Sequence, residues 1–170
     1  TLKRKAPPET YVFTGKNTST TTIKHIKYNN SILGVYDTVQ ELEDDVVDYI
    51  AIEGFSNVDL IVDLCVKFNV DKLVIEDILN INQRNKVEIH ENYIFFVQKY
   101  INIKDDVINN DYLSILLFED KIVTFSETQN VFLGDILERL KNKKSIIRNS
   151  KHNYLLYAIY DMLIDEQLHI

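Results

Sequence analysis

Cysteine is almost absent from this sequence, because Cys65 is the only one among 170 residues. A single cysteine excludes an intramolecular disulfide and points to a reducing compartment. Cys65 lies in the apolar run of residues 60–66, which has helical spacing, so we expect a buried thiol and not a reactive nucleophile. The longest apolar stretches, residues 94–97 and 115–118, fall far short of the roughly 20 residues that cross a bilayer, so the chain as given is predicted to be soluble.

Glycine is also scarce, with four residues in the whole chain. Neither a dinucleotide-binding G-x-G-x-x-G motif nor a phosphate-binding loop can be written, and no G-x-S-x-G nucleophile motif occurs. No histidine has a second histidine four residues further on, as a zinc-binding helix would. Each is therefore expected to be a surface or half-buried residue and not a ligand: His25, His90, His152 and His169. We predict that the protein is not an enzyme.

The two prolines stand together as Pro7-Pro8, where they close a polar N-terminal arm of residues 1–9. No later proline marks a linker, so residues 10–170 are expected to form a single domain. The 26 acidic residues outnumber the 19 basic ones and give a formal net charge of −7. This balance argues against a protein that tracks nucleic-acid phosphates, which needs a basic surface, and favours the attraction of cations.

The pattern of apolar residues predicts both strands and helices. Strands are expected over residues 11–14, 20–28, 32–36, 46–52, 87–103 with an interruption at Asn92, 112–118 and 121–125. Helices are expected over residues 38–43 with Thr38 as N-cap, 58–68 capped by Ser56-Asn57, 71–79 with Asp71 as N-cap, and in the chain from Phe132 onward. Glu119-Asp120 is expected to be a tight hairpin turn. The fold class is therefore α/β (α+β), an αβα sandwich with a mixed parallel and antiparallel central sheet flanked by helices.

Two groups of carboxylates interrupt apolar helical patterns. Glu76-Asp77 lies within residues 73–79, and Asp161 and Asp165 stand four residues apart near the C-terminus. Like charges at that spacing destabilise a helix by about 0.2–0.5 kcal/mol unless a cation or a basic partner neutralises them. A hard divalent cation such as Mg²⁺ would suit these oxygens. Two alternatives are solvated polar faces and a carboxylate pair for glycoside hydrolysis, although no aromatic sugar platform surrounds them.

A long run of residues resembles a known family. Residues 73–88, LVIEDILNINQRNKVE, continue into ENYIFFV at residues 91–97, and this run resembles the cytosolic signature of the CorA family of magnesium and cobalt channels. The similarity extends to residues 7–15 and to residues 146–157, and so covers nearly the whole chain. The sequence departs from the family at Asp71-Lys72, where His-Pro is common, and at Asn85, where proline is usual.

The resemblance implies an N-terminal αβα sandwich followed by a long stalk helix, two transmembrane helices and a Gly-Met-Asn motif. The sequence stops at Ile170, at the start of the stalk region, and the transmembrane helices are absent from it. We therefore expect a fragment that is soluble, cut from a multi-pass membrane protein, and located on the cytoplasmic side of the cell (inner) membrane. Its only link to the membrane would be through the missing C-terminal helices.

The resemblance also implies a regulatory metal site between the subunits of a homopentamer. The matching ligands are Asp77 most directly, then Glu76 and Asp161, with Asp165 acting from further away. The ion would be Mg²⁺, and Co²⁺ or another divalent cation could substitute. A bound cation would stabilise the closed ring, and its loss would let like charges repel and the channel open. The opposing carboxylate would come from the stalk helix of the adjacent subunit, so this chain would hold half of each site.

Two other functions remain open from the sequence. One is the cytosolic domain of a related zinc transporter, although residues 80–88 favour the magnesium branch. The other is an α/β interaction domain that uses no metal. For a magnesium or a zinc transporter, the expected partners are divalent cations and the protein's own subunits. Nucleic acid is not expected as a partner for any of these functions.

Overall fold

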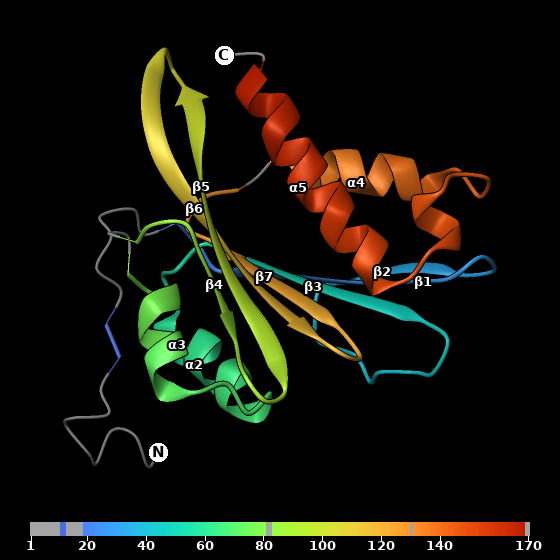
Figure 1. Ribbon diagram of the computed structural model, residues 1–170, viewed down its shortest axis with the longest axis horizontal. Helices are drawn as coiled ribbons and strands as arrows, with labels where there is room; N and C mark the ends of the chain where they lie inside the picture. The colour runs from blue at the N-terminus through green and yellow to red at the C-terminus, as the bar shows by residue number, and fades with distance from the viewer. Residues whose placement is uncertain (1–10, 13–18, 81–82, 130, 169–170) are drawn as a thin grey trace.

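A computed structural model describes residues 11–12, 19–80, 83–129 and 131–168, in which one mixed sheet separates two layers of helices (Figure 1). The strands are β1 (Thr22–Tyr28), β2 (Leu33–Tyr36), β3 (Val47–Glu53), β4 (Lys86–Ile89), β5 (Tyr93–Lys104), β6 (Val107–Phe118) and β7 (Ile122–Ser126). The helices are α2 (Val58–Lys67), α3 (Lys72–Ile78), α4 (Val131–Lys141), the short 3₁₀ turn η2 (Ile147–Asn149) and α5 (His152–Leu168).

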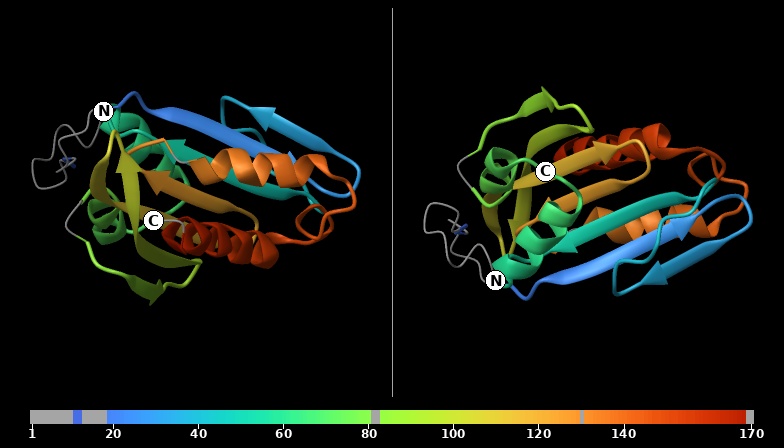
Figure 2. Two further views of the ribbon diagram at one scale, coloured as in Figure 1. Left: turned by 90° about the horizontal axis from the view of Figure 1, so that it is seen from above. Right: turned by 90° about the horizontal axis from the view of Figure 1, so that it is seen from below.

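The seven strands follow the order β2-β1-β3-β7-β6-β5-β4, so that β2 and β4 form the two edges of the sheet. β3 and β7 pair in parallel, and the other neighbouring pairs are antiparallel. Helices α2 and α3 cover one face, and α4 and α5 lie beside each other on the other face, as the views from above and below show (Figure 2). The predicted αβα sandwich with a mixed sheet is confirmed.

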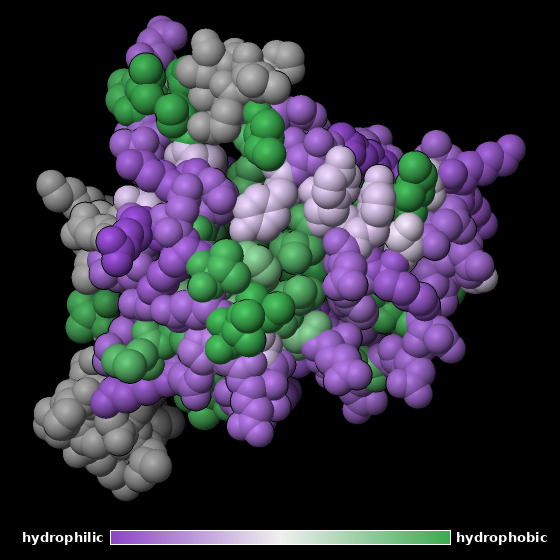
Figure 3. Space-filling view, in the orientation of Figure 1, coloured by the Kyte–Doolittle hydropathy of each residue, from purple (hydrophilic) through white to green (hydrophobic). Residues whose placement is uncertain are grey.

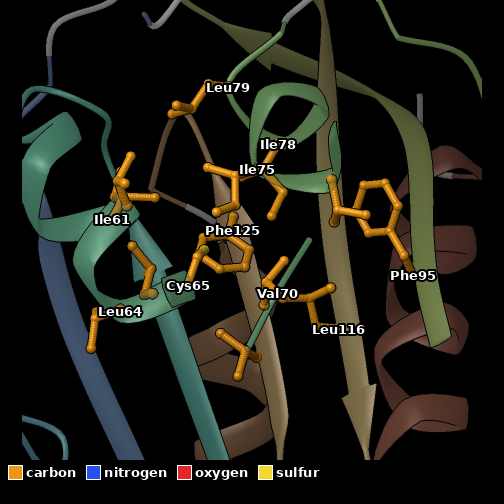
Figure 4. Packing of buried hydrophobic residues seen from close by; sticks show 14 of the residues in the cluster. Ile61, Leu64, Cys65, Val70, Ile75, Ile78, Leu79, Phe95, Leu116 and Phe125 are labelled. Carbon is orange, nitrogen blue, oxygen red and sulfur yellow. The ribbon is translucent and has the colours of Figure 1, made fainter. Parts of the chain in front are cut away.

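Each face of the sheet has its own hydrophobic core. Along β3, Tyr49 and Ala51 belong to the core under α4 and α5, whereas Ile50 and Ile52 belong to the core under α2 and α3. Alternate residues of a strand point to opposite faces, so a strand with cores on both sides is apolar throughout. The second core is shown from close by in Figure 4, where residues of α2 and α3 pack on Phe125 and Leu116 of the sheet.

The helix predicted over residues 38–43 is wrong, because this segment has no regular structure. Two side chains of β1 bind its backbone instead. His25 Nδ1 accepts a hydrogen bond from the Gln40 N–H at 2.8 Å, and the Lys27 ammonium donates to the carbonyl oxygen of Glu41. Because side chains of β1 bind these backbone groups, the two groups do not need helical hydrogen-bond partners. The capping pattern at Thr38 is thus outweighed by tertiary contacts.

The other local predictions are largely confirmed. Asn57 caps α2 by accepting a hydrogen bond from the Leu60 N–H at 3.1 Å. The interruption predicted at Asn92 separates β4 from β5, and Glu119-Asp120 forms the turn between β6 and β7. Tyr11 and Val12 are not in a strand, and the rest of the strand predicted at residues 11–14 lies outside the described residues, as does the arm of residues 1–9.

The hairpin of β5 and β6 is longer than the sequence indicates, since β6 begins at Val107 and not at Tyr112. Its turn residues Asp105 and Asp106 have φ angles of 53° and 60°. Two consecutive residues with positive φ are the requirement of the type I′ turn that joins twisted strands, and aspartate adopts this conformation more readily than most residues. Figure 1 shows the hairpin extending beyond the rest of the sheet.

Exposed apolar residues gather where β4 and β5 lie beside α5, at the centre of the face shown in Figure 3. Val87 lies opposite Phe96 in the β4–β5 ladder, and the Phe96 ring contacts Tyr160 of α5, so the apolar side chains of β4 project on the α5 side. Four exposed apolar residues of β4 and α5 are called the α5 apolar face here: Val87, Ile89, Tyr157 and Ile164. Within the described residues, no helix is both long enough and apolar enough to cross a membrane.

Candidate divalent-cation site

Helix α3 presents Glu76 and Asp77 on its outer side. Val74, Ile75 and Ile78 are buried against the sheet at helical spacing, which turns the two acidic residues between them away from the core. Glu76 is exposed, and the Asp77 side chain is 30% exposed. Both carboxylates are therefore accessible to an ion from solvent.

Asp77 is held by two partners from the segment that follows α3. The Lys86 ammonium lies 2.5 Å from Asp77 Oδ2, and Gln83 Nε2 donates to Asp77 Oδ1 at 3.2 Å. Lys86 also lies 3.5 Å from Glu88 Oε2. Partial burial lowers the pKa of Lys86, but the hydrogen bonds and the attraction of Asp77 and Glu88 more than offset it and raise the pKa above its ordinary value. Lys86 is therefore charged at neutral pH.

The register of β4 places Lys86 beside α3. Lys86 lies opposite Val97 and Glu88 lies opposite Phe95, and both of these β5 residues belong to the core under α2 and α3. Alternation along the strand puts Lys86 and Glu88 on that face. The Lys86 ammonium is 5.5 Å from the centre of the Phe95 ring, within cation–π distance.

The start of α3 is fixed by a second polar cluster. Asp71 is at the predicted N-cap position, but its carboxylate makes no capping hydrogen bond and instead accepts one from the Tyr93 hydroxyl at 2.9 Å. His90 Nδ1 lies 2.9 Å from the same carboxylate, and its ring stacks on Tyr93 at 4.8 Å. Burial, together with Asp71, raises the pKa of Tyr93 to about 12. These contacts tie α3 to the turn between β4 and β5, and so fix Asp77 relative to Lys86.

The other two predicted ligands lie on α5. The Asp161 side chain is 39% exposed and lies 3.9 Å from Arg139 Nη1 of α4, and Asp165 is exposed one turn further on. The opposite side of α5 packs into the core through Leu155, Ile159 and Leu163. Helices α3 and α5 cover opposite faces of the sheet, so Asp77 and Asp161 are not brought together in one chain (Figure 1).

The donor set fits part of a site for a hard cation. Mg²⁺ prefers oxygen ligands and keeps several waters, so one or two carboxylates can be the whole contribution of one chain. Glu76 and Asp77 supply such oxygens from adjacent positions. In the part of the chain that the structure describes, no three His, Cys, Asp or Glu side chains converge to hold a metal ion. A cation at Asp77 would thus need further ligands from water or from another molecule. It would also approach the positive charge of Lys86.

A buried polar cluster was not foreseen from the sequence. His25 Nε2 lies 2.7 Å from Asp48 Oδ1, and the Lys27 ammonium lies 3.0 Å from the same oxygen. Because His25 Nδ1 accepts from Gln40, Nε2 carries the hydrogen and donates to Asp48. His25 has 0% exposure, so the prediction of a surface or half-buried residue is wrong for it. The available signal was the presence of these charged and polar residues within segments that the sequence predicts to be strands.

Two other histidines and the cysteine have the burial that the sequence predicts. His90 and His152 are half-buried, as expected, and His169 lies outside the described residues. Cys65 is fully buried on α2, as Figure 4 shows, and burial raises the pKa of its thiol to about 12. The prediction that the Cys65 thiol is buried is confirmed, and a buried thiol with a raised pKa is a poor nucleophile.

This chain is similar to known proteins both in sequence and in fold. A family model described as CorA-like Mg²⁺ transporter protein matches residues 55–170. The cobalt/magnesium transport protein CorA of Thermotoga maritima is 30% identical over 172 residues, which cover 96% of this chain and 49% of that protein. The chain therefore spans about half the length of this relative.

Two solved structures are similar in fold. The complete structure of the CorA magnesium transporter from Methanocaldococcus jannaschii has a TM-score of 0.66 at 18% identity, over 86% of this chain and 44% of that one. The cytoplasmic domain of ZntB from Vibrio parahaemolyticus has a TM-score of 0.61 at 12% identity, over 83% of this chain and 57% of that one. At these identities the likeness concerns the fold.

Proposed function

The chain belongs to the family of CorA-like Mg²⁺ transporter proteins, and on this premise we propose that it is the cation-sensing part of a magnesium and cobalt transporter, on the cytoplasmic side of the membrane. The family is one of transporters, which favours a role in ion transport over an enzymatic one. The observation that carries the sensing role is the outward-facing carboxylate pair Glu76-Asp77 on α3, inside the matched region and with the donor chemistry of a Mg²⁺ ligand.

The position of the carboxylates supports an assembly of subunits. Asp77 and Asp161 lie on opposite faces of the sheet, so one chain offers an acidic group on each side. A head-to-tail interface, in which different surfaces of identical chains meet, generates a closed ring when the rotation closes. In the proposed homopentamer a carboxylate of the adjacent subunit completes the coordination of each ion at Asp77.

The gating mechanism follows from this arrangement. A divalent cation between two acidic subunit surfaces binds the closed ring better than the open one, and so shifts the population toward the closed state. When cytoplasmic Mg²⁺ falls, the ion leaves and the carboxylates of adjacent subunits repel each other. The ring then opens and admits Mg²⁺, which makes Asp77 part of a feedback sensor.

The α5 apolar face supports self-association. Val87, Ile89, Tyr157 and Ile164 are all exposed large apolar residues. Exposed apolar residues that gather on one face can mark a protein–protein contact. An assembled protein would cover it, whereas the chain alone leaves it in contact with water.

The proposal is tested by limited proteolysis of the full-length protein in its membrane-extracted, assembled state during titration with Mg²⁺ or Co²⁺. We expect protection to increase with either ion, and Asp77→Asn to shift the midpoint to higher concentration. Asp37→Asn is the matched control, because Asp37 also lies 2.5 Å from a lysine, Lys24, but at the β2 edge of the sheet.

Each outcome of this titration favours one function. Protection by Mg²⁺ and Co²⁺ that depends on Asp77 supports the proposed sensor. Protection by Zn²⁺ alone would favour the zinc transporter, for which the ZntB likeness gives the fold only. Protection that no divalent cation changes would contradict the sensor and favour an interaction domain that uses no metal.

A further inference from the structure

The Lys86 ammonium contacts one of the two carboxylate oxygens with which Asp77 could bind a cation. This ammonium lies 2.5 Å from Asp77 Oδ2, closer than an ordinary hydrogen bond between these groups. We propose that Lys86 is a built-in competitor for the divalent cation: it neutralises Asp77 when no ion is bound and must leave Oδ2 when one binds. This inference rests on the proposed function of Asp77 as a ligand and adds a residue that sets the ion concentration at which the site fills.

The geometry makes simultaneous binding unfavourable. Mg²⁺ binds carboxylate oxygen at about 2.1 Å, so an ion on Oδ2 would lie within about 5 Å of the Lys86 ammonium in its present position. Two positive charges at this separation repel each other, and the side chains are only 24% and 30% exposed, which limits screening by water. The ion therefore gains the carboxylate only by displacing the lysine.

Lys86 has a second partner that allows this displacement. Glu88, two residues along β4 on the same face, has its Oε2 3.5 Å from the ammonium, and the Phe95 ring lies beneath it at 5.5 Å. A lysine that leaves Asp77 can thus remain paired and partly covered, and no buried charge is left without a partner. The competition weakens ion binding without abolishing it.

Gln83 holds the other side of the carboxylate. Its Nε2 donates to Asp77 Oδ1 at 3.2 Å and to the Asp77 carbonyl oxygen at 3.3 Å. This fixes the orientation of the carboxylate, so that Oδ2 is the oxygen shared between lysine and cation. The three residues lie within ten positions of the sequence, so the competing charge is part of the same local unit as the ligand.

The test is a Mg²⁺ titration of the 170-residue chain, followed by NMR at constant ionic strength. Lys86→Met removes the charge and keeps an apolar stem over Phe95. We expect it to lower the apparent dissociation constant for Mg²⁺ by about two- to fivefold, the range that corresponds to partly exposed ion pairs. Lys86→Arg keeps the charge and is expected to return the constant to the wild-type value or above it. In the wild type, the Lys86 side-chain resonance is expected to shift together with that of Asp77.

Lys24→Met is the matched control. Lys24 lies 2.5 Å from Asp37 at the other edge of the sheet, so this variant makes the same change in net charge away from Asp77. It is expected to leave the dissociation constant unchanged. An equal gain in affinity in Lys24→Met and Lys86→Met would attribute the effect to net charge and overturn the competitor role.

The remaining outcomes separate this inference from the proposed function. If Asp77→Asn weakens Mg²⁺ binding and Lys86→Met leaves it unchanged, Asp77 remains a ligand and the competitor role of Lys86 is overturned. If wild-type binding is unchanged in both single variants, both fail. If neither the wild type nor Lys86→Met binds Mg²⁺ as an isolated chain, the competitor role of Lys86 is overturned, and the proposed function is decided by the titration of the assembled protein. A double variant Asp77→Asn/Lys86→Met that binds as tightly as Lys86→Met alone would also contradict the account, because the competition requires Asp77.

Discussion

Asp77 and Asp161 lie on helices that cover opposite faces of one sheet, with Asp77 on α3 and Asp161 on α5. Each has a cationic neighbour from its own side, Lys86 for Asp77 and Arg139 for Asp161. A single chain therefore carries two separate acidic positions and not one assembled site. This separation agrees with the proposed assembly, in which each side of the chain meets a different neighbour.

The first prediction concerns removal of metal from the chain alone. Because the proposed site is complete only in the assembly, EDTA is expected to leave the thermal midpoint of the chain unchanged. A cation that binds only the folded state stabilises it by about 1.4 kcal/mol at ten times its dissociation constant, so millimolar Mg²⁺ should raise the midpoint slightly. The measurement is calorimetric melting, with NaCl at matched ionic strength as control. A loss of several kcal/mol in EDTA would indicate a complete site within the chain.

The buried pair of His25 and Asp48 gives the second prediction. Asp48→Ala removes the carboxylate that both His25 and Lys27 contact, and leaves the Lys27 ammonium buried without it. Breaking a buried pair in this way costs about 3–5 kcal/mol of unfolding free energy, measured by urea titration. Asp37→Ala, at an exposed pair, is expected to cost less than about 1 kcal/mol. Equal effects of the two variants would contradict the structural role of Asp48.

The same cluster explains where prediction from the sequence failed. The apolar periodicity was sufficient for the helices at Val58–Lys67 and Lys72–Ile78 and for most strands, because local burial decides these elements. It failed at residues 38–43, because the hydrogen bonds that decide this segment come from His25 and Lys27, more than ten positions away. Such contacts depend on which strands become neighbours, and the spacing of residues within a segment does not contain this information.

The candidate site also has one part that could be predicted from the sequence and one part that could not. The outward position of Glu76 and Asp77 follows from the helical pattern around them, and the structure agrees with it. The ion pair with Lys86 depends on the register of β4 with β5, which brings a residue nine positions further on back to α3. Lys86 was visible in the sequence as part of the family-like run, but nothing in the spacing alone indicated which carboxylate it would contact.

His152 gives the third prediction, on pH. His152 is the first residue of α5, and its Nε2 accepts a hydrogen bond from the Asp48 N–H at 3.3 Å. Burial lowers the pKa of His152 despite the attraction of Asp48 and Asp120. The unfolded chain therefore takes up a proton at a higher pH than the folded chain does. This contribution to stability is present above about pH 6.5 and is lost as the pH falls toward the folded-state pKa.

Urea titrations between about pH 7.5 and pH 5 measure this effect. His152→Gln is expected to flatten the decrease in unfolding free energy relative to the wild type, and the same difference should persist in a His90→Gln background. Parallel curves for the wild type and His152→Gln would show that His152 does not contribute to the pH dependence.

The fourth prediction concerns Cys65. With a pKa raised to about 12 by burial, the thiolate fraction near pH 8 is about one in ten thousand, and the sulfur is covered by the core under α2 and α3. A thiol reagent such as DTNB is therefore expected to leave the native protein unmodified for hours and to react completely in denaturant. Rapid stoichiometric reaction of the native protein would place Cys65 at an accessible position and contradict the packing.

The central claim is that Asp77 is a ligand whose site is completed only by another part of the assembly. Isothermal titration calorimetry of Mg²⁺ into the monomeric 170-residue chain, with Asp77→Ala in parallel, tests it most directly. We expect weak binding, of about millimolar affinity, that Asp77→Ala removes. Micromolar binding to the monomer that Asp77→Ala leaves undiminished would contradict the claim.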